Sequence, residues 1–247
     1  MTAQLVSAIV AALAGACVGS FLATVARRWG EGPAAALTGR SSCDSCGTVL
    51  GPLDLVPILS RIVLHGRCRH CRAPIPLDET WIEAASGLVA VVAVLATPAS
   101  IAWVMLAGWL LVLLAAIDHF HGLLPDLLNG TLLLAGLLAL LFDPMAPSAM
   151  DGLAGGLLGA AGFAALALGY QAVRGRSGLG GGDIKLMGAL GIWVGLTGLA
   201  WVVLVAAASA LVASLIAARG RFEPSHAIRF GPWLGGAGFA VLVLARY

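Results

Sequence analysis

Two sets of side chains in this sequence could do chemistry. Asp118 and Asp183 each stand at the edge of a long apolar run, where a charged group is costly and is therefore a candidate for function. Elsewhere, two Cys-x-x-Cys pairs are separated by 21 residues and comprise Cys43, Cys46, Cys68 and Cys71. The aspartates suggest acid–base catalysis, and the cysteines suggest a metal site.

Two aspartates that share a site cannot both ionise easily, so one tends to keep its proton while the other is charged. The charged partner can take a proton from a water that attacks an amide. The protonated partner can polarise the carbonyl and later protonate the amine. This is the chemistry of aspartic proteases, and it requires no metal. Gly180 and Gly182, just before Asp183, would let the backbone approach a substrate because no Cβ intervenes.

Each of these acidic residues also has a structural interpretation. Asp183 could simply cap a helix after the glycine run. Asp126 is a rival of Asp118, since it follows Pro125 and precedes an apolar run, which is also typical of a helix N-terminus. Lys185 could pair with an aspartate or anchor the chain at the membrane interface. The residues alone leave these alternatives open.

The four cysteines suit a single tetrahedral zinc ion, because paired Cys-x-x-Cys motifs supply four thiolates. Four thiolates leave no position for water, so we expect a structural zinc and not a catalytic one. Two disulfides are the alternative, which a reducing compartment disfavours. His65 or His70 could also replace one thiolate as a ligand.

The composition limits the classes of protein that can carry these groups. The 247 residues are 60% hydrophobic and only 11% charged, whereas soluble domains are about 25% charged. This excludes an ordinary soluble enzyme and a disordered chain. The net charge of +2 gives no basic face for nucleic acid. We therefore predict an all-α polytopic membrane protein whose surroundings are the lipid bilayer.

Apolar runs near the length of a bilayer span predict about eight transmembrane helices. They lie near residues 4–26, 82–98, 101–117, 127–142, 152–171, 184–199, 200–217 and 231–245. The predicted domains are the first transmembrane helix at 1–26, a cytoplasmic zinc-binding loop at 27–81, and a seven-helix membrane core at 82–247. Gly15 and Gly19 predict a close packing face on the first helix.

Basic residues give the orientation. With eight spans, 13 of the 14 lysines and arginines lie at one side, which the positive-inside rule makes cytoplasmic, and Arg246 is the exception. The third helix then runs inward and the sixth runs outward. Asp118 and Asp183 are therefore predicted at the same cytoplasmic edge.

Together these motifs resemble the type IV prepilin peptidases, which are integral-membrane aspartic proteases of the Gly-x-Gly-Asp kind. The resemblance covers nearly the whole chain. It rests on Gly19-Ser20-Phe21-Leu22, the paired cysteines, Asp118 with Leu124-Pro125-Asp126, and Gly180-Gly181-Gly182-Asp183-Ile184-Lys185. It implies that Asp118 and Asp183 are the catalytic pair and favours Asp118 over Asp126. Gly180, Gly182, Lys185, Pro125 and Asp126 become active-site support.

The resemblance also implies a substrate and a location. The substrate would be the leader of type IV prepilins or pseudopilins, cut after glycine at the cytoplasmic face of the bacterial inner membrane. Pilus or type II secretion machinery would be the partner. Many relatives with the four-cysteine loop also methylate the new N-terminus with S-adenosylmethionine. The chain departs from their pattern at Trp29-Gly30 and at Asp78-Glu79-Thr80. The alternatives are a membrane transporter and a non-catalytic component of a pilus or secretion machine.

Overall fold

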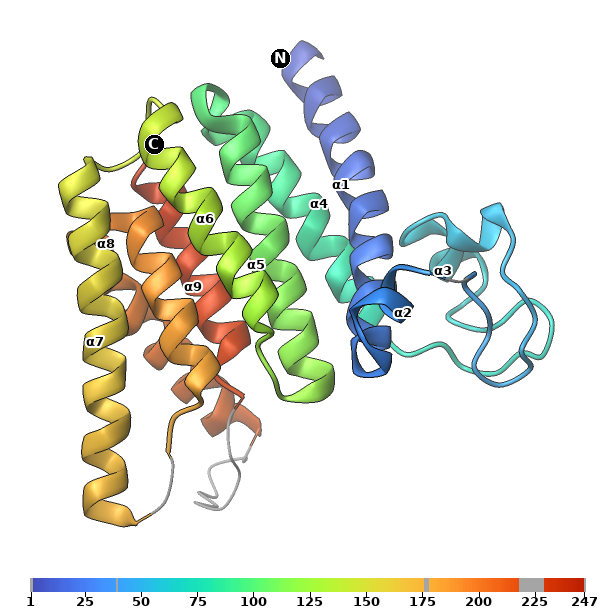
Figure 1. The fold of residues 1–247 in the computed structure, drawn as a ribbon. Coiled ribbons are helices and arrows are strands. Elements are labelled where there is room, and N and C mark those ends of the chain that lie inside the picture. Colours follow the sequence, from blue (N-terminus) through green and yellow to red (C-terminus); the bar gives the residue numbers. More distant parts are fainter. Residues whose placement is uncertain (1, 39, 176–177, 218–228, 247) are drawn as a thin grey trace. The chain divides into compact units, whose positions relative to one another are not determined.

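The computed structural model describes residues 2–38, 40–175, 178–217 and 229–246. The regular elements in these residues are helical, apart from two isolated β-bridges (Figure 1). The α-helices are α1 (Thr2–Arg28), α2 (Pro33–Leu37), α3 (Leu59–Val63), α4 (Asp78–Ala96), α5 (Ile101–His121), α6 (Asp126–Phe142), α7 (Ala149–Arg174), α8 (Gly181–Ala217) and α9 (Gly231–Leu244). Short 3-10 turns are η1 (Trp29–Glu31), η2 (Pro52–Leu55) and η3 (Pro98–Ser100). The chain forms two compact units, residues 1–98 and residues 99–247.

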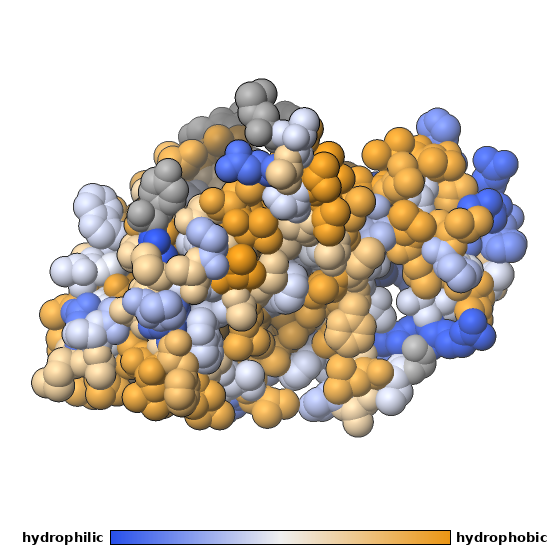
Figure 2. All heavy atoms as spheres, turned by 90° about the horizontal axis from the view of Figure 1, so that it is seen from above, coloured by the Kyte–Doolittle hydropathy of each residue, from blue (hydrophilic) through white to orange (hydrophobic). Residues whose placement is uncertain are grey.

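Several helices have the length and composition of membrane spans. Five described segments meet both conditions, namely Thr2–Glu31, Asp78–Ala96, Pro98–His121, Ala149–Arg174 and Gly181–Ile216. The helices α6 and α9 are apolar but shorter. Large apolar side chains also lie exposed, and orange groups cover much of the face drawn in Figure 2. The prediction of an all-helical membrane protein is confirmed.

Helix α8 contains a break at Gly195, whose φ of 69° and ψ of −178° suit glycine far better than any other residue. A methyl group on Gly159 of α7 would lie 2.8 Å from the carbonyl oxygen of Met187 and 3.0 Å from the side chain of Leu199. Residues on either side of the break therefore pack against the same point. Two helical segments in this region were predicted correctly, but the predicted division between residues 199 and 200 is wrong by about four residues.

The position of this break has a local cause. The Asp151 carboxylate accepts a hydrogen bond from the backbone N–H of Leu196, at 3.2 Å, and so caps the second segment of α8. Hydropathy could not locate this cap because the apolar run continues through it. The break at Gly195 lets one long apolar stretch form two helical segments of the second unit.

In the first unit, α1 and α4 pack with their backbones close together. A methyl group on Gly15 would lie 2.6 Å from the carbonyl oxygen of Ser86, and one on Gly19 would lie 2.7 Å from the Cα of Glu83. No larger residue fits at either position without moving backbone. This confirms the predicted packing face, which follows the small-residue logic of membrane helices.

The second unit is built around a buried indole and a buried ion pair. Trp193 is 2% exposed and donates its Nε1–H to the carbonyl oxygen of Leu132 at 2.9 Å. The guanidinium of Arg246 bonds the Asp143 carboxylate at 3.0 Å, and the hydroxyl of Ser100 also donates to that carboxylate. A buried charge requires such a partner. Arg246, the one basic residue predicted outside the cytoplasmic side, is thus used as an internal clamp.

Candidate active site and metal centre

Asp118 lies in the last turn of α5 and is only 7% exposed. The helix ends just beyond it because Gly122 adopts a left-handed conformation, with φ of 67°. The N–H of Gly122 then bonds the carbonyl oxygen of Asp118 at 2.9 Å. This cap holds the aspartate at the rim of the unit instead of inside the apolar length of the helix.

Asp183 lies in the first turn of α8 and is half-buried. Its carboxylate accepts a backbone hydrogen bond from Gly180 and interacts electrostatically with Asp118. A methyl group on Gly182 would lie 2.7 Å from the Cβ of Leu124, so the start of α8 packs tightly on the segment that follows α5. The structure therefore brings together the two aspartates that the charge pattern assigned to one edge.

The start of α9 also meets this pair. A methyl group on Gly231 would lie 2.6 Å from Oδ2 of Asp118, and the backbone N–H of Gly231 interacts with the same carboxylate. The positive charge of Arg229 acts on Asp118 as well. The sequence analysis missed Arg229 and Gly231. The signal that could have found them is an arginine shortly before a Gly-Pro helix start on the predicted cytoplasmic side.

One oxygen of Asp118 has an unusual environment. Oδ2 is buried, and within the described residues no group makes a hydrogen bond of full geometry to it. Buried polar atoms are nearly always partnered in proteins, so an orphaned acceptor beside a second carboxylate is a mark of function. Oδ2 of Asp118 could accept a proton or a hydrogen bond from a substrate.

Asp126, the alternative to Asp118, lies at the start of α6. It is exposed and pairs with Lys185, whose Nζ lies 2.6 Å from Oδ1 of Asp126. Pro125 immediately precedes Asp126 at the start of α6. The alternatives for Lys185 are thus decided in favour of pairing with an aspartate. Exposed pairs of this kind contribute little to stability, about 0–1 kcal/mol.

The four cysteines of the two Cys-x-x-Cys pairs form a cluster in the first unit. Their sulfur atoms all lie within 4.8 Å of one another, and the Sγ atoms of Cys43 and Cys71 are 3.7 Å apart. Tetrahedral zinc with bonds of about 2.3 Å places its sulfurs about 3.8 Å apart. All five cysteines are free thiols, so the disulfide alternative is not observed. Neither His65 nor His70 belongs to the cluster.

The two halves of the cluster repeat one backbone design. In each, the residue after the second cysteine has a positive φ, 68° at Gly47 and 63° at Arg72. In each, the N–H of the first cysteine bonds the carbonyl oxygen five residues ahead, at 3.0 Å for Cys43 and 2.9 Å for Cys68. Each knuckle is then closed by one isolated bridge, Ser42 with Val49 and Arg67 with Pro74. Local turns therefore aim both pairs of thiols at one point.

The thiols are electrostatically prepared for a cation. Hydrogen bonding with the side chain and backbone of Thr48 lowers the pKa of Cys46 to about 6. The backbone N–H groups of Cys71 and His70 lower the pKa of Cys68. The N–H of Ala73 acts to lower the pKa of Cys71, yet burial and the neighbouring sulfurs raise it to about 11. Four crowded thiols can all lose their protons only when a positive charge lies between them, and a divalent metal ion would supply it.

Comparison with known proteins links both sites to one family. The chain matches the family model "Bacterial Peptidase A24 N-terminal domain" over residues 13–97 and the model "Type IV leader peptidase family" over residues 104–217. It is 35% identical over 220 residues to a prepilin leader peptidase/N-methyltransferase of Aeromonas hydrophila, covering 86% of this chain and 74% of the relative. The chain belongs to the type IV leader peptidase family.

Other members give the same result. A prepilin leader peptidase/N-methyltransferase of Burkholderia pseudomallei (strain K96243) is 40% identical over 206 residues, which are 82% of this chain and 66% of the relative. A type 4 prepilin-like proteins leader peptide-processing enzyme of Escherichia coli O78:H11 is 31% identical over 83% of this chain and 76% of its own length. This leader peptidase homologue thus spans about two thirds of the Burkholderia relative. No solved structure matches the chain.

The two family models coincide with the two units. The N-terminal model lies within residues 1–98, where the cysteine cluster is found, and the peptidase model lies within residues 99–247, where the aspartates meet. In this leader peptidase homologue, each unit therefore carries one candidate site. The Arg229–Gly231 segment lies beyond the end of the matched peptidase region.

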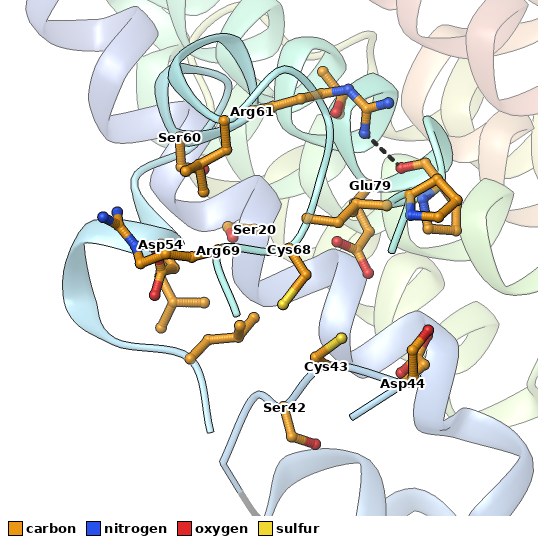
Figure 3. Close-up of a pocket in the computed structure, with 18 of the residues that line it drawn as sticks. Ser20, Ser42, Cys43, Asp44, Asp54, Ser60, Arg61, Cys68, Arg69 and Glu79 are labelled. Carbon is orange, nitrogen blue, oxygen red and sulfur yellow. Dashed lines mark hydrogen bonds and ion pairs between the residues drawn. The ribbon is translucent and has the colours of Figure 1, made fainter. Parts of the chain in front are cut away.

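The N-terminal unit of the leader peptidase homologue also contains a cavity of about 120 Å³, whose walls include Cys43 and Cys68 of the cysteine cluster. Figure 3 shows Ser20, Glu79, Arg61 and Asp54 among its walls. A larger adjoining hollow, of about 560 Å³, shares the walls formed by Ser20 and Glu79. Both hollows lie between α1, the start of α4 and the loop.

Charged contacts organise this cavity. Arg27 donates to Glu79 at 2.8 Å and to Asp44 at 3.1 Å. Glu83 accepts a hydrogen bond of 2.8 Å from the N–H of Ile58, a β-branched residue held at a positive φ of 60°. A non-glycine residue in that conformation is strained and needs fixed surroundings. The loop is thus tied to α4 by a carboxylate at the base of the cavity.

Proposed function

We propose that this chain is a membrane aspartic endopeptidase that removes the leader of type IV prepilins or pseudopilins. The observation that supports this most is the meeting of Asp118 and Asp183, from separate helices, at one end of the second unit. Asp126 is exposed and paired with Lys185, which favours Asp118 as the partner of Asp183. The relatives named above are prepilin peptidases, and their names supply the substrate class.

The proposed reaction is the hydrolysis of one amide bond. The ionised aspartate takes a proton from a water molecule as the water oxygen bonds to the scissile carbonyl carbon. The protonated aspartate gives its proton to the carbonyl oxygen, and a tetrahedral diol forms. The first aspartate then passes the proton that it took from water to the leaving nitrogen, and a hydroxyl of the diol returns a proton to the second aspartate. The C–N bond breaks, and a carboxylic acid and a neutral amine are released. The buried Oδ2 of Asp118, to which no described group makes a hydrogen bond of full geometry, is suited to accept the first proton.

The proposed setting is the bacterial inner membrane, with cleavage after glycine at its cytoplasmic face. Within the described residues, the five helices long enough to span a membrane, the shorter α6 and α9, and the division of α8 at Gly195 would together supply eight spans. The aspartates then lie on the side that carries almost all lysines and arginines. A prepilin could place its apolar segment in the bilayer while its leader reaches this edge. Pilus or type II secretion machinery would use the product.

Co-expression with a prepilin tests this proposal. We expect Asp118→Asn and Asp183→Asn to abolish leader removal, because each takes away one proton-transfer group, while both proteins still insert. Asp126→Asn is the matched comparison and is expected to retain most cleavage. N-terminal sequencing of the pilin gives the result. Full processing by either of the first two variants, or loss only with Asp126→Asn, would refute the assignment. Uptake into proteoliposomes that depended on these aspartates would instead support a transporter.

A structural zinc at the four cysteines is part of the same proposal. The sulfur spacing and the paired turns support a tetrahedral ion, and the four thiolates leave it no open position for water. The ion would hold the loop in shape, which also fixes the walls of the adjoining cavity.

We further propose that the cavity of the first unit serves a second activity, N-methylation of the newly exposed terminus. The names of the relatives include N-methyltransferase, and S-adenosylmethionine would supply the methyl group. The two hollows together have a size usual for ligand sites, and Asp44, Glu79 and Glu83 line them with carboxylates that suit an ammonium group. Mass spectrometry of the mature pilin tests this. An unmodified N-terminus on fully cleaved pilin would exclude methylation of that substrate.

A further inference from the structure

The segment at the beginning of α9 interacts with Asp118. The positive charge of Arg229 and the backbone N–H of Gly231 both stabilise the ionised Asp118 carboxylate, and both residues belong to this one short segment. The Nε of Arg229 lies 3.8 Å from the point where a Cβ on Gly122 would stand, which places the guanidinium over the turn that follows Asp118. The described groups that act on Asp183 are the Asp118 carboxylate and the N–H of Gly180.

Other charges nearby do not remove this difference. His119, next to Asp118 on α5, also acts on Asp118. Lys185, two residues after Asp183 on α8, is bonded to Asp126 instead. The positive groups that act on the pair therefore gather at Asp118.

Helix dipoles alone would not favour Asp118 as the ionised member of the pair. Asp183 stands in the first turn of α8, and Asp118 meets the first residue of α9, so each lies near the positive end of a helix. Asp118 also lies at the C-terminal, negative end of α5. Arg229 is therefore the group that decides which carboxylate is charged, since an adjacent cation favours the ionised form.

We infer that Arg229 and the N–H of Gly231 hold Asp118 as the ionised base of the pair, and that Asp183 carries the shared proton as the acid. This inference rests on the proposed peptidase function and assigns a role to each aspartate within it. Arg229 and Gly231 are positioning residues, because they act on Asp118 and not on the substrate. Gly231 has a steric reason as well, since a methyl group there would press on Oδ2 of Asp118.

The pH dependence of cleavage tests the role of Arg229. The purified full chain would be assayed on a prepilin, and kcat/KM would be followed from acidic to neutral pH. Loss of the cation disfavours the ionised base, so Arg229→Gln should move the midpoint of the acidic limb to higher pH by about one unit. Arg229→Lys keeps the charge and should restore most of the wild-type profile. A wild-type profile for a folded Arg229→Gln protein would overturn the inference.

A pair of glycine variants on one helix tests the contact with Gly231. Gly231→Ala should slow cleavage by at least about 100-fold, because small displacements of a reacting group are that costly. Gly236→Ala is the matched control, since a methyl group there meets nothing within 4 Å, and it should stay within about 2-fold of wild type. Equal activity of the two variants would contradict the assignment.

Infrared spectroscopy separates this inference from the proposed function, because it needs no substrate. The carbonyl stretch of a protonated carboxyl group should be present in the wild-type protein at mildly acidic pH, where burial keeps a proton on Asp183. It should vanish in Asp183→Asn and persist in Asp118→Asn. The reverse pattern would overturn the assignment of acid and base even if the protein cleaves prepilins. Failure of the wild-type protein to cleave would count against the function alone.

Discussion

The cysteine cluster and the aspartate pair are assembled in opposite ways. Two local turns build the cluster, and each places its own pair of thiols with hydrogen bonds that span only a few residues. The aspartate pair needs the end of α5, the start of α8 and the start of α9. The first site depends on short-range chain geometry, and the second depends on how distant helices pack.

This difference determines how each site should fail. The cysteine cluster should lose its ability to bind a metal ion when one thiol is removed, because a tetrahedral ion needs all four ligands. The aspartate site should be sensitive to small steric changes at helix contacts, where glycines allow close approach. Charges at the exposed rim of either region should matter least.

Removal of one ligand should give the largest effect on the molecule. Cys68→Ser is expected to reduce bound zinc from about one ion per chain to none, and to unfold the loop of residues 40–77. Structural zinc in small domains contributes about 10–16 kcal/mol, so the loop cannot stay folded without it. Metal analysis and limited proteolysis would measure both changes.

Cys17→Ser is the matched control for this experiment. Cys17 lies exposed on α1, apart from the cluster, so its loss should leave the zinc content unchanged. If the Cys68→Ser protein bound as much zinc as the wild type, the cluster would not be a metal site, and the contrast between the two sites would be wrong.

Neighbouring glycines at the start of α8 should sharpen the comparison at the second site. A methyl group on Gly182 meets the Cβ of Leu124 at 2.7 Å, whereas one on Gly181 meets nothing within 4 Å. We expect Gly182→Ala to slow leader cleavage about 100-fold by displacing Asp183, with zinc content unaffected. Gly181→Ala should be nearly neutral. Cleavage rates of the two variants, measured side by side, decide this, and a reversed order would contradict the packing described.

The smallest effect is expected at Asp54, which bonds Arg69 at 2.7 Å. The bond to Arg69 holds the pKa of Asp54 below its ordinary value of 3.8. The stabilisation is therefore complete above about pH 4 and is lost as the pH falls through the lower, folded value. Because Arg69 is half exposed, Asp54→Asn should cost less than about 1 kcal/mol near neutral pH and nothing in strong acid.

Thermal unfolding of the wild type and of Asp54→Asn, compared across this pH range, gives the measurement. A difference that grows on acidification would show that the ion pair has been assigned the wrong sign.

Sequence alone could predict the features that depend on local pattern or on charge count. The Cys-x-x-Cys spacing was enough to identify the cluster, because each pair closes its own turn. The parity of the helices and the bias of lysine and arginine predicted Asp118 and Asp183 at one edge, and in the structure the two carboxylates interact.

The remaining features arise from contacts between distant segments. In the sequence, Arg229 cannot be distinguished from the other basic residues predicted on the cytoplasmic side. Only the packing of α9 against α5 brings Arg229 to Asp118. The pairing of Lys185 with Asp126 and the break at Gly195 likewise depend on neighbouring helices. No periodicity in a single segment carries that information.

Cross-linking of the two aspartate positions tests the central claim most directly. In a Cys17→Ser background that retains the four clustered cysteines, the double variant Asp118→Cys/Asp183→Cys should react efficiently with a short thiol cross-linker within one chain. The pair Asp151→Cys/Asp183→Cys should not react. Asp183 lies at the start of the first segment of α8, whereas Asp151 contacts α8 at the break that ends this segment. Cross-linking of the first pair alone is the expected result. Failure of positions 118 and 183 to cross-link in the folded protein would contradict the account.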